Sequence, residues 1–327
     1  LKADELAALV ERVFQPGPKE RVLAVLVDLP DDRVPDNAEW AQRRQMAASW
    51  VRELDSAPDH GIRAALYAYR NVHSNNDELP AAGRRFDPDS LTEHASQAAH
   101  EADVELEAVL SQHPIVIAPT EMSGTAPLNM MSPRLWFRAA PMPRVSPAMI
   151  PALRLDYTEV NRRVLYLKQL LDEAVSSDID FLVDGDTHME LHLDLRHRSA
   201  HASGGLFPEP GVAGNLPSGE TYIAPIEGTA EGTIVINGSI PGMVINTDSE
   251  LVLTFERGRL TRVEPAGSPA TRWLYETQIN KAQAAGDLEW SNLAEIGIGL
   301  NPAVTRLSGN MLFDEKAGGT AHIALGT

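Results

Sequence analysis

Short apolar runs alternate with segments of helical periodicity through the first part of this 327-residue chain. Three runs have the length and apolar content of buried strands: Arg21–Leu29, Ile62–Tyr69 and the proline-bounded Pro114–Pro119. Helical spacing of apolar residues marks the segments 3–14, Glu39–Leu54 and Ser90–Ser111. Strands that alternate with helices predict an α/β domain, in which a parallel sheet has helices on both faces.

The pattern changes in the second part of the chain. A connector rich in proline, serine and methionine (119–151) is followed by a predicted helix, Tyr157–Ser176. Short strands bounded by glycine, asparagine and proline then follow at 187–195, 221–226, 232–237, 242–246, 250–256 and 259–263, with a helix at 271–285 that ends at Gly286. We therefore expect an α/β domain over residues 1–145 and a β-rich α+β domain over residues 146–327.

The composition excludes several classes of function. The formal net charge of 28 − 46 = −18 argues against nucleic acid and anionic membranes as partners. No apolar run approaches the length of a membrane span. Because the chain has no cysteine, disulfides, thiolate metal sites and a cysteine nucleophile are excluded, and any transition-metal site must use His, Asp and Glu. A cytoplasmic location fits this composition.

Polar residues alternate with apolar ones in the predicted strand Thr187–Leu195, which places His188, Glu190, His192 and Asp194 on one face. The two histidines lie roughly 13 Å apart on a strand, too far to share one ion. Neighbouring His and Glu residues, roughly 6.6 Å apart, could do so. The alternative is an ordinary amphipathic strand with a hydrated face. His197 and His201 follow in a predicted loop, exposed or lining a cleft.

Three residues further along are candidate metal ligands. Glu220 follows a glycine- and proline-rich loop (204–219), whose rigidity would hold its carboxylate in place. Glu295 lies in the otherwise apolar strand 293–299, where an unpaired carboxylate would cost several kcal/mol unless the strand turns it to solvent. His322 lies among small and apolar residues (320–326). Two carboxylates and an imidazole are a plausible ligand set for Zn²⁺, Co²⁺, Mn²⁺ or Fe²⁺.

These residues stand within motifs that resemble those of the M29 metalloaminopeptidases, the aminopeptidase T and S group. The motifs cover residues 215–326 in order: Asn215-Leu-Pro-Ser-Gly-Glu220 with Ala224-Pro225 and Gly228, Gly232-Thr233, Ala294-Glu295 with Gly299 and Asn301-Pro302, Asp314-Glu-Lys316, Gly319-Thr320, and His322 through Gly326.

The resemblance implies a homodimeric hydrolase that removes N-terminal residues from short peptides. It implies an N-terminal α/β domain and a β-rich C-terminal domain with two divalent cations (Zn, Co or Mn), held by Glu220, Glu295 and His322. Glu295 would bridge the cations and serve catalysis. The cations would polarise the scissile carbonyl and activate a water molecule, while an acidic wall would hold the free α-amino group.

Two expected features of this family fall beyond the sequence. The family has a tyrosine seven residues after the histidine and, further on, a His-x-Asp pair that completes the metal site, but the sequence ends at Thr327, five residues past His322. We expect a further C-terminal segment to carry them, and an N-terminal segment to precede Leu1.

The 2,5-dihydroxypyridine dioxygenases resemble the chain more distantly. They hold one Fe(II) with two histidines and an aspartate, and a histidine stands where this chain has Glu295. Glu295 therefore favours the peptidase. A mononuclear iron ring-cleaving dioxygenase and a catalytically silent scaffold or binding protein are the alternatives.

Overall fold

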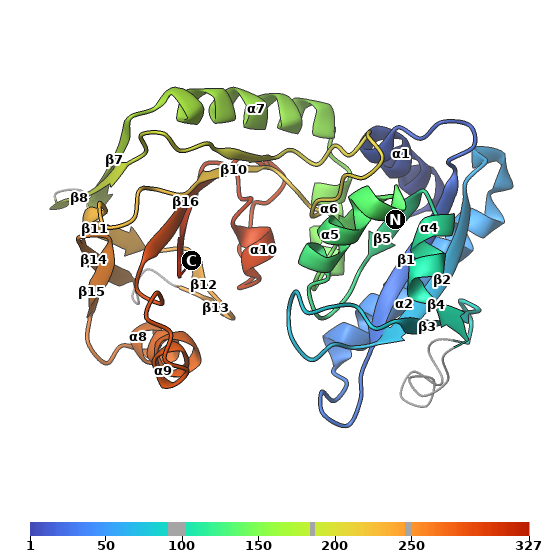
Figure 1. Ribbon diagram of the computed structural model, residues 1–327, viewed down its shortest axis with the longest axis horizontal. Helices are drawn as coiled ribbons and strands as arrows, with labels where there is room; N and C mark the ends of the chain where they lie inside the picture. The colour runs from blue at the N-terminus through green and yellow to red at the C-terminus, as the bar shows by residue number, and fades with distance from the viewer. Residues whose placement is uncertain (91–102, 184–186, 246–249, 327) are drawn as a thin grey trace. The chain divides into compact units, whose positions relative to one another are not determined.

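The computed structural model describes residues 1–90, 103–183, 187–245 and 250–326 (Figure 1). The chain forms two compact units. Leu1–Glu159 and Gly205–Ser218 make up the first, and Val160–Gly204 and Gly219–Thr327 make up the second. The expected boundary near residue 145 lies inside the first unit, and the chain passes between the units more than once.

The first unit contains a six-stranded mixed sheet in the order β4-β3-β2-β1-β5-β6. Its strands are β1 (Val22–Leu29), β2 (Arg63–Arg70), β3 (Ala82–Phe86), β4 (Val104–Glu105), β5 (Ile115–Ala118) and β6 (Arg138–Pro141). Strands β2, β1, β5 and β6 run parallel, and β3 and β4 add an antiparallel edge. The predicted parallel sheet is confirmed.

Helices bury the apolar side chains of this sheet. They are α1 (Ala3–Phe14), α2 (Ala38–Ser56), α4 (Leu106–Gln112), α5 (Thr125–Leu135) and the short α6 (Ile150–Leu153). Residues of α4 and α5 pack with Ala24 and Leu26 of β1 in one cluster. The alternate residues of β1, Leu23 and Val25, are buried as well, so both faces of the strand are covered.

Two expectations for this unit are wrong in part. Residues 91–102 of the predicted helix Ser90–Ser111 lie outside the described residues, but Val104–Glu105 is a strand, because it pairs with Ala82 and Gly83 of β3. The helix begins only at Leu106.

The segment 119–151 is more than a connector, because it contains α5 and β6. Its prolines are compatible with a helix. Pro127 lies in the first turn, where backbone N–H groups have no partner within the helix. Pro133 removes one bond near the end of the helix, and the carbonyl of Asn129 accepts from the Ser132 hydroxyl at 3.3 Å.

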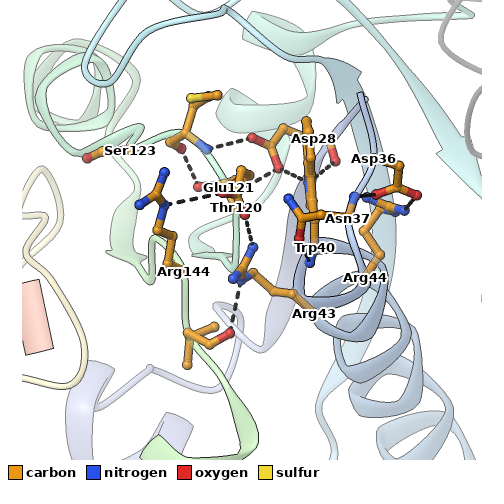
Figure 2. A network of polar contacts seen from close by, with 12 residues as sticks. Asp28, Asp36, Asn37, Trp40, Arg43, Arg44, Thr120, Glu121, Ser123 and Arg144 are labelled. Atoms are coloured by element: carbon orange, nitrogen blue, oxygen red, sulfur yellow. Dashed lines mark hydrogen bonds and ion pairs between the residues drawn. The ribbon is translucent and has the colours of Figure 1, made fainter. Parts of the chain in front are cut away.

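A buried carboxylate joins the carboxyl ends of β1 and β5 (Figure 2). Oδ1 of Asp28 accepts from the Trp40 indole at 2.9 Å and from the backbone N–H of Glu121 at 2.7 Å. Oδ2 accepts from the backbone N–H of Met122 at 2.8 Å. The Glu121 side chain in turn pairs with the buried guanidinium of Arg43. These contacts hold the loop after β5 against β1.

The second unit is built from antiparallel strands. A four-stranded sheet has the order β17-β16-β10-β9, a five-stranded sheet the order β15-β14-β11-β8-β7, and β12 pairs with β13. The strands are β7 (Ser176–Val183), β8 (Thr187–Asp194), β9 (His201–Ser203), β10 (Glu220–Ile223), β11 (Glu231–Ile236), β12 (Ser239–Ile240), β13 (Met243–Val244), β14 (Leu251–Glu256), β15 (Arg259–Glu264), β16 (Leu293–Gly299) and β17 (Ala321–Leu325). The β-rich second part is confirmed.

Helices complete this unit. Most of α7 (Tyr157–Glu173) belongs to it, and the carbonyl of Val164 accepts from the buried hydroxyl of Thr221 on β10 at 2.9 Å. The helix predicted at 271–285 consists of α8 (Pro269–Leu274), a π-helical segment (Tyr275–Ile279) and α9 (Asn280–Ala284). Within the described chain, no helix combines the length and the apolar character needed to cross a membrane.

Candidate metal centre

One face of the sheet β17-β16-β10-β9 gathers the three candidate ligands. Glu220 begins β10 and lies opposite Gly299 of β16, while His322 of β17 lies opposite Gly297. Glu295 belongs to the same face of β16, since it is two residues from Gly297. The sheet therefore brings together side chains that are far apart in the sequence. The Nε2 atom of His322 lies 3.6 Å from Oε2 of Glu220 and 3.5 Å from Oε1 of Glu295.

The glycines of β16 make this arrangement possible. A Cβ atom on Gly297 would lie 2.1 Å from Nε2 of His322, and one on Gly299 would lie 2.1 Å from the carbonyl oxygen of Ala317. Neither distance is tolerated in a protein. The imidazole of His322 thus occupies the space that a side chain at Gly297 would fill.

The ligand atoms are buried without ordinary partners. The side chains of Glu220 and His322 are 8% and 11% exposed, and that of Glu295 is 29% exposed. Among the described residues, neither ring nitrogen of His322 nor Oε2 of Glu220 has a hydrogen-bond partner. Buried polar atoms are nearly always satisfied. The unpartnered Oε2 of Glu220 and Nε2 of His322, 3.6 Å apart, fit a bound divalent cation.

Two further residues lie at the site, and the sequence motifs had predicted a role for neither. Glu315 follows α10 (Met311–Asp314), and one donor atom each from Glu220, Glu315 and His322 lie within 4.8 Å of one another. The fully buried Lys316 donates to Oε1 of Glu220 at 2.8 Å and also pairs with Glu315. Both belong to the Asp314-Glu-Lys316 motif, which could have identified them as site residues from the sequence.

The charges at this site influence one another. Burial raises the pKa of Glu315; the ammonium of Lys316 opposes this shift, and the carboxylate of Glu220 adds to it. Burial alone would lower the pKa of Lys316, but the carboxylates of Glu220 and Glu315 more than offset that effect, so the pKa is raised. Lys316 therefore stays a cation within an acidic cluster.

A cavity of about 670 Å³ opens onto this cluster. Glu295, Glu315 and His322 lie at its lining. Most of the remaining lining is apolar. Residues of β11, β14, β17 and the helical segment 269–284 contribute to it, together with Trp290 from the turn before β16; the apolar side chains include Ile234, Ile236, Leu251, Leu253, Leu274, Ile279 and Ile323. A volume of this size is typical of a site for a small molecule or a short peptide.

The histidines of β8 lie apart from this cluster. His188 pairs with Asp180 and His192 with Asp178, in both cases with a neighbouring aspartate of β7, and all four side chains are exposed. In the described part of the chain, a set of three donor atoms within 4.8 Å occurs at the Glu220 cluster and not on this strand. The amphipathic interpretation of β8 fits this geometry.

The histidines that follow β8, His197 and His201, have different surroundings. His197 lies in a turn with a positive φ of 62°. The exposed ring of His201 stacks on that of Tyr222, with the ring centroids 5.2 Å apart. Because Tyr222 is opposite both His201 and Gly297, these residues form one row of the sheet with His322.

One family model and two solved structures are similar to this chain. The family model described as thermophilic metalloprotease (M29) matches residues 151–327. No curated protein has significant similarity to the sequence. The structure of 2,5-dihydroxypyridine dioxygenase from Pseudomonas putida KT2440 is similar in fold, with a TM-score of 0.61 and 18% identity over 97% of this chain and 84% of that chain. For wild-type AmpT from Thermus thermophilus the TM-score is 0.45 and the identity 17%, over 99% of this chain and 85% of that chain.

Proposed function

Because this chain belongs to the family of thermophilic metalloproteases M29, we propose that it is a metal-dependent aminopeptidase that releases N-terminal residues from short peptides. One observation carries the proposal. Glu220, Glu295 and His322 meet on one sheet face, and buried donor atoms of Glu220 and His322 have no hydrogen-bond partner in the described chain. Such atoms are expected at a site built for a cation.

The donor set fits divalent cations such as Zn²⁺, Co²⁺ or Mn²⁺. Glu220, Glu295 and His322 would hold them, and Glu315 offers a further carboxylate oxygen. Oxygen and imidazole nitrogen are the usual protein ligands of these ions. Two cations are proposed, as in the family that the motifs resemble.

Cations bound here would polarise the scissile carbonyl and lower the pKa of a coordinated water. The residues of the chain would position the substrate. Glu220, Glu295 and Glu315 are three acidic side chains against the single ammonium of Lys316, so the metal-free site attracts divalent cations. Glu295 is the most exposed of the three predicted ligands and lines the cavity, so we expect it to lie next to the reacting bond.

The cavity suggests which peptides bind. Its lining is mainly aliphatic, with Trp290 as an aromatic side chain. An apolar side chain of the substrate is stabilised there by its removal from water. A charged side chain would lose its hydration and find few polar partners in return. We therefore expect faster release of large apolar N-terminal residues than of acidic ones.

The test combines metal analysis with turnover. The wild type should bind about two equivalents of Zn²⁺ or Co²⁺ and hydrolyse aminoacyl-nitroanilides, with activity lost to a chelator and restored by the metal. E295Q removes a ligand charge without a change in volume. Its kcat/KM should fall more than about 100-fold, since even the loss of a group that only supports a ligand costs 10–100-fold. E276Q, at an exposed position of the π-helical segment, is the matched control.

Other results would favour the alternatives. Wild-type activity in E295Q would show that Glu295 is structural and would contradict the assignment. One equivalent of iron with oxygen-dependent ring cleavage would favour a dioxygenase. A chain that binds no metal and turns over no peptide would be a silent scaffold. The homodimer and the cytoplasmic location remain predictions, which sedimentation velocity and cell fractionation can test.

A further inference from the structure

A lysine stands inside the acidic cluster of the candidate metal centre. Lys316 is fully buried, and its Nζ atom donates to Oε1 of Glu220 at 2.8 Å and to Glu315. Lysine is almost never fully buried unless it is paired. Here both partners are residues that could bind a metal ion.

The backbone around Lys316 is held on both sides. Its N–H donates to the carbonyl of Phe313 at 3.1 Å, and its carbonyl accepts from the N–H of the buried Asn301 at 2.9 Å. Two residues earlier, the side chain of Asp314 accepts hydrogen bonds from the backbone N–H groups of Ser308 and Gly309. The ammonium group therefore extends from a backbone segment with little freedom to move.

Lys316 makes the two oxygens of Glu220 different from each other. Oε1 is engaged by the ammonium, while Oε2 has no hydrogen-bond partner among the described residues and lies 3.6 Å from Nε2 of His322. The lysine thereby orients the carboxylate so that one oxygen faces the other donor atoms. It also supplies the positive charge that the carboxylates need when they are buried together.

We propose that Lys316 is a resident counter-cation, which keeps Glu220 and Glu315 in their ligating positions while no metal ion is bound. This role rests on the proposed metal site. A bound divalent cation would supply much of the same compensation, so the contribution of Lys316 to stability should be largest in the metal-free protein and smaller in the loaded one. A lysine with a purely structural role would contribute equally in both states.

The variant K316M tests this difference, because it removes the charge and keeps most of the side-chain volume. Thermal unfolding of the full chain is measured in EDTA and in saturating Zn²⁺. Breaking a buried ion pair is strongly destabilising, so the midpoint in EDTA should fall by about 10 °C. In Zn²⁺ the loss should be less than half of that value. The control K168M removes an exposed ammonium that pairs with Asp172 and should change neither midpoint appreciably.

Two further variants separate charge from packing. K316R keeps the cation and should be closer to the wild type in EDTA than K316M is. The double variant E315Q/K316M removes one opposing charge as well and should recover part of the loss; it also serves if K316M does not fold without metal. Equal losses for K316M with and without Zn²⁺ would overturn the role of Lys316. If Zn²⁺ fails to bind to or stabilise the wild type, the proposed function itself is overturned.

Discussion

Two buried carboxylates of this protein are satisfied to different degrees. Asp28 accepts three hydrogen bonds, from the Trp40 indole and from the backbone N–H groups of Glu121 and Met122. Glu220 accepts from Lys316 through one oxygen, and its other oxygen has no hydrogen-bond partner within the described residues. A complete set of donors marks Asp28 as a structural anchor of the loop after β5, whereas the free oxygen of Glu220 suits a ligand.

The titration of Asp28 should appear in the pH dependence of stability. Burial raises the pKa of Asp28 from 3.8 to about 6, against the opposing effect of its hydrogen bonds. Between these two pKa values the folded chain binds the proton more tightly than the unfolded chain does. The free energy of unfolding therefore falls as the pH rises. An asparagine at this position cannot ionise. As the pH rises from 4 to 7, the wild type should therefore lose up to about 3 kcal/mol of unfolding free energy relative to D28N.

Urea unfolding at both pH values measures this shift. D28N should be the less stable protein at pH 4, because its amide NH2 would face the N–H of Met122 as donor against donor, whereas the hydroxyl oxygen of the protonated carboxyl can still accept. D59N, at an exposed position in the 3-10 turn Pro58–His60, is the control and should follow the wild type. Parallel profiles for D28N and the wild type would show that Asp28 keeps its ordinary pKa in the folded protein.

At the scale of elements, the strand β16 serves the core and the site at once. Ile296 is buried in the core cluster of the second unit. The opposite face carries Glu295, Gly297 and Gly299, and the two glycines leave space for His322 and for the carbonyl of Ala317. From Glu295 to Gly299 the alternation of the strand thus separates core packing from the candidate site; Leu293, which is also buried in the core, lies before the register shift at Leu293/Glu295.

The variant G297A should lose metal binding while it keeps the sheet. Its Cβ would lie 2.1 Å from Nε2 of His322, so the imidazole must leave its place. The Kd for Zn²⁺, measured by competition with a chelating dye, should rise at least about 10-fold. G124A is the control, since a Cβ there meets no atom nearer than 3.8 Å and the residue lies in the first unit. Unchanged affinity in G297A would remove His322 from the ligand set.

At the scale of the whole molecule, the candidate ligands all belong to one compact unit. Glu220, Glu295, Glu315 and His322 lie in the second unit, and the Asp28 contacts lie in the first. A ligand that binds only the folded form of one unit stabilises that unit by mass action. The effect of metal ions on stability should therefore be unequal along the chain.

Calorimetry with and without Zn²⁺ tests this expectation. At about 100 times the Kd, binding stabilises the folded form by about 2.7 kcal/mol, which should raise the transition of the second unit by roughly 5–10 °C. Hydrogen exchange should slow in β10, β16 and β17 and stay unchanged in β1, β2 and β5. Equal shifts throughout the chain would show that the two units unfold together.

Local patterns in the sequence were sufficient for much of the fold. The apolar runs at β1, β2 and β5 and the helical spacing of α2 and α7 predicted those elements, because neighbouring residues alone determine their periodicity. The strand β6, Arg138-Ala-Ala-Pro, has no such pattern; it is a strand because β5 pairs with it. The strand β7 was not predicted either, although Asp178-Ile-Asp-Phe181 alternates polar and apolar residues as a strand does; it pairs with β8 along its whole length.

The same distinction holds for the site. The cost of burying Glu295 and the motifs around Glu220 and His322 were sufficient to predict these three as ligands from the sequence. The tertiary structure alone places Lys316 against Glu220, although 96 residues separate them, and adds Glu315 and an apolar cavity. It also leaves His188 and His192 on an exposed surface. Burial and charge compensation depend on which strands become neighbours, and the periodicity of a segment does not contain that information.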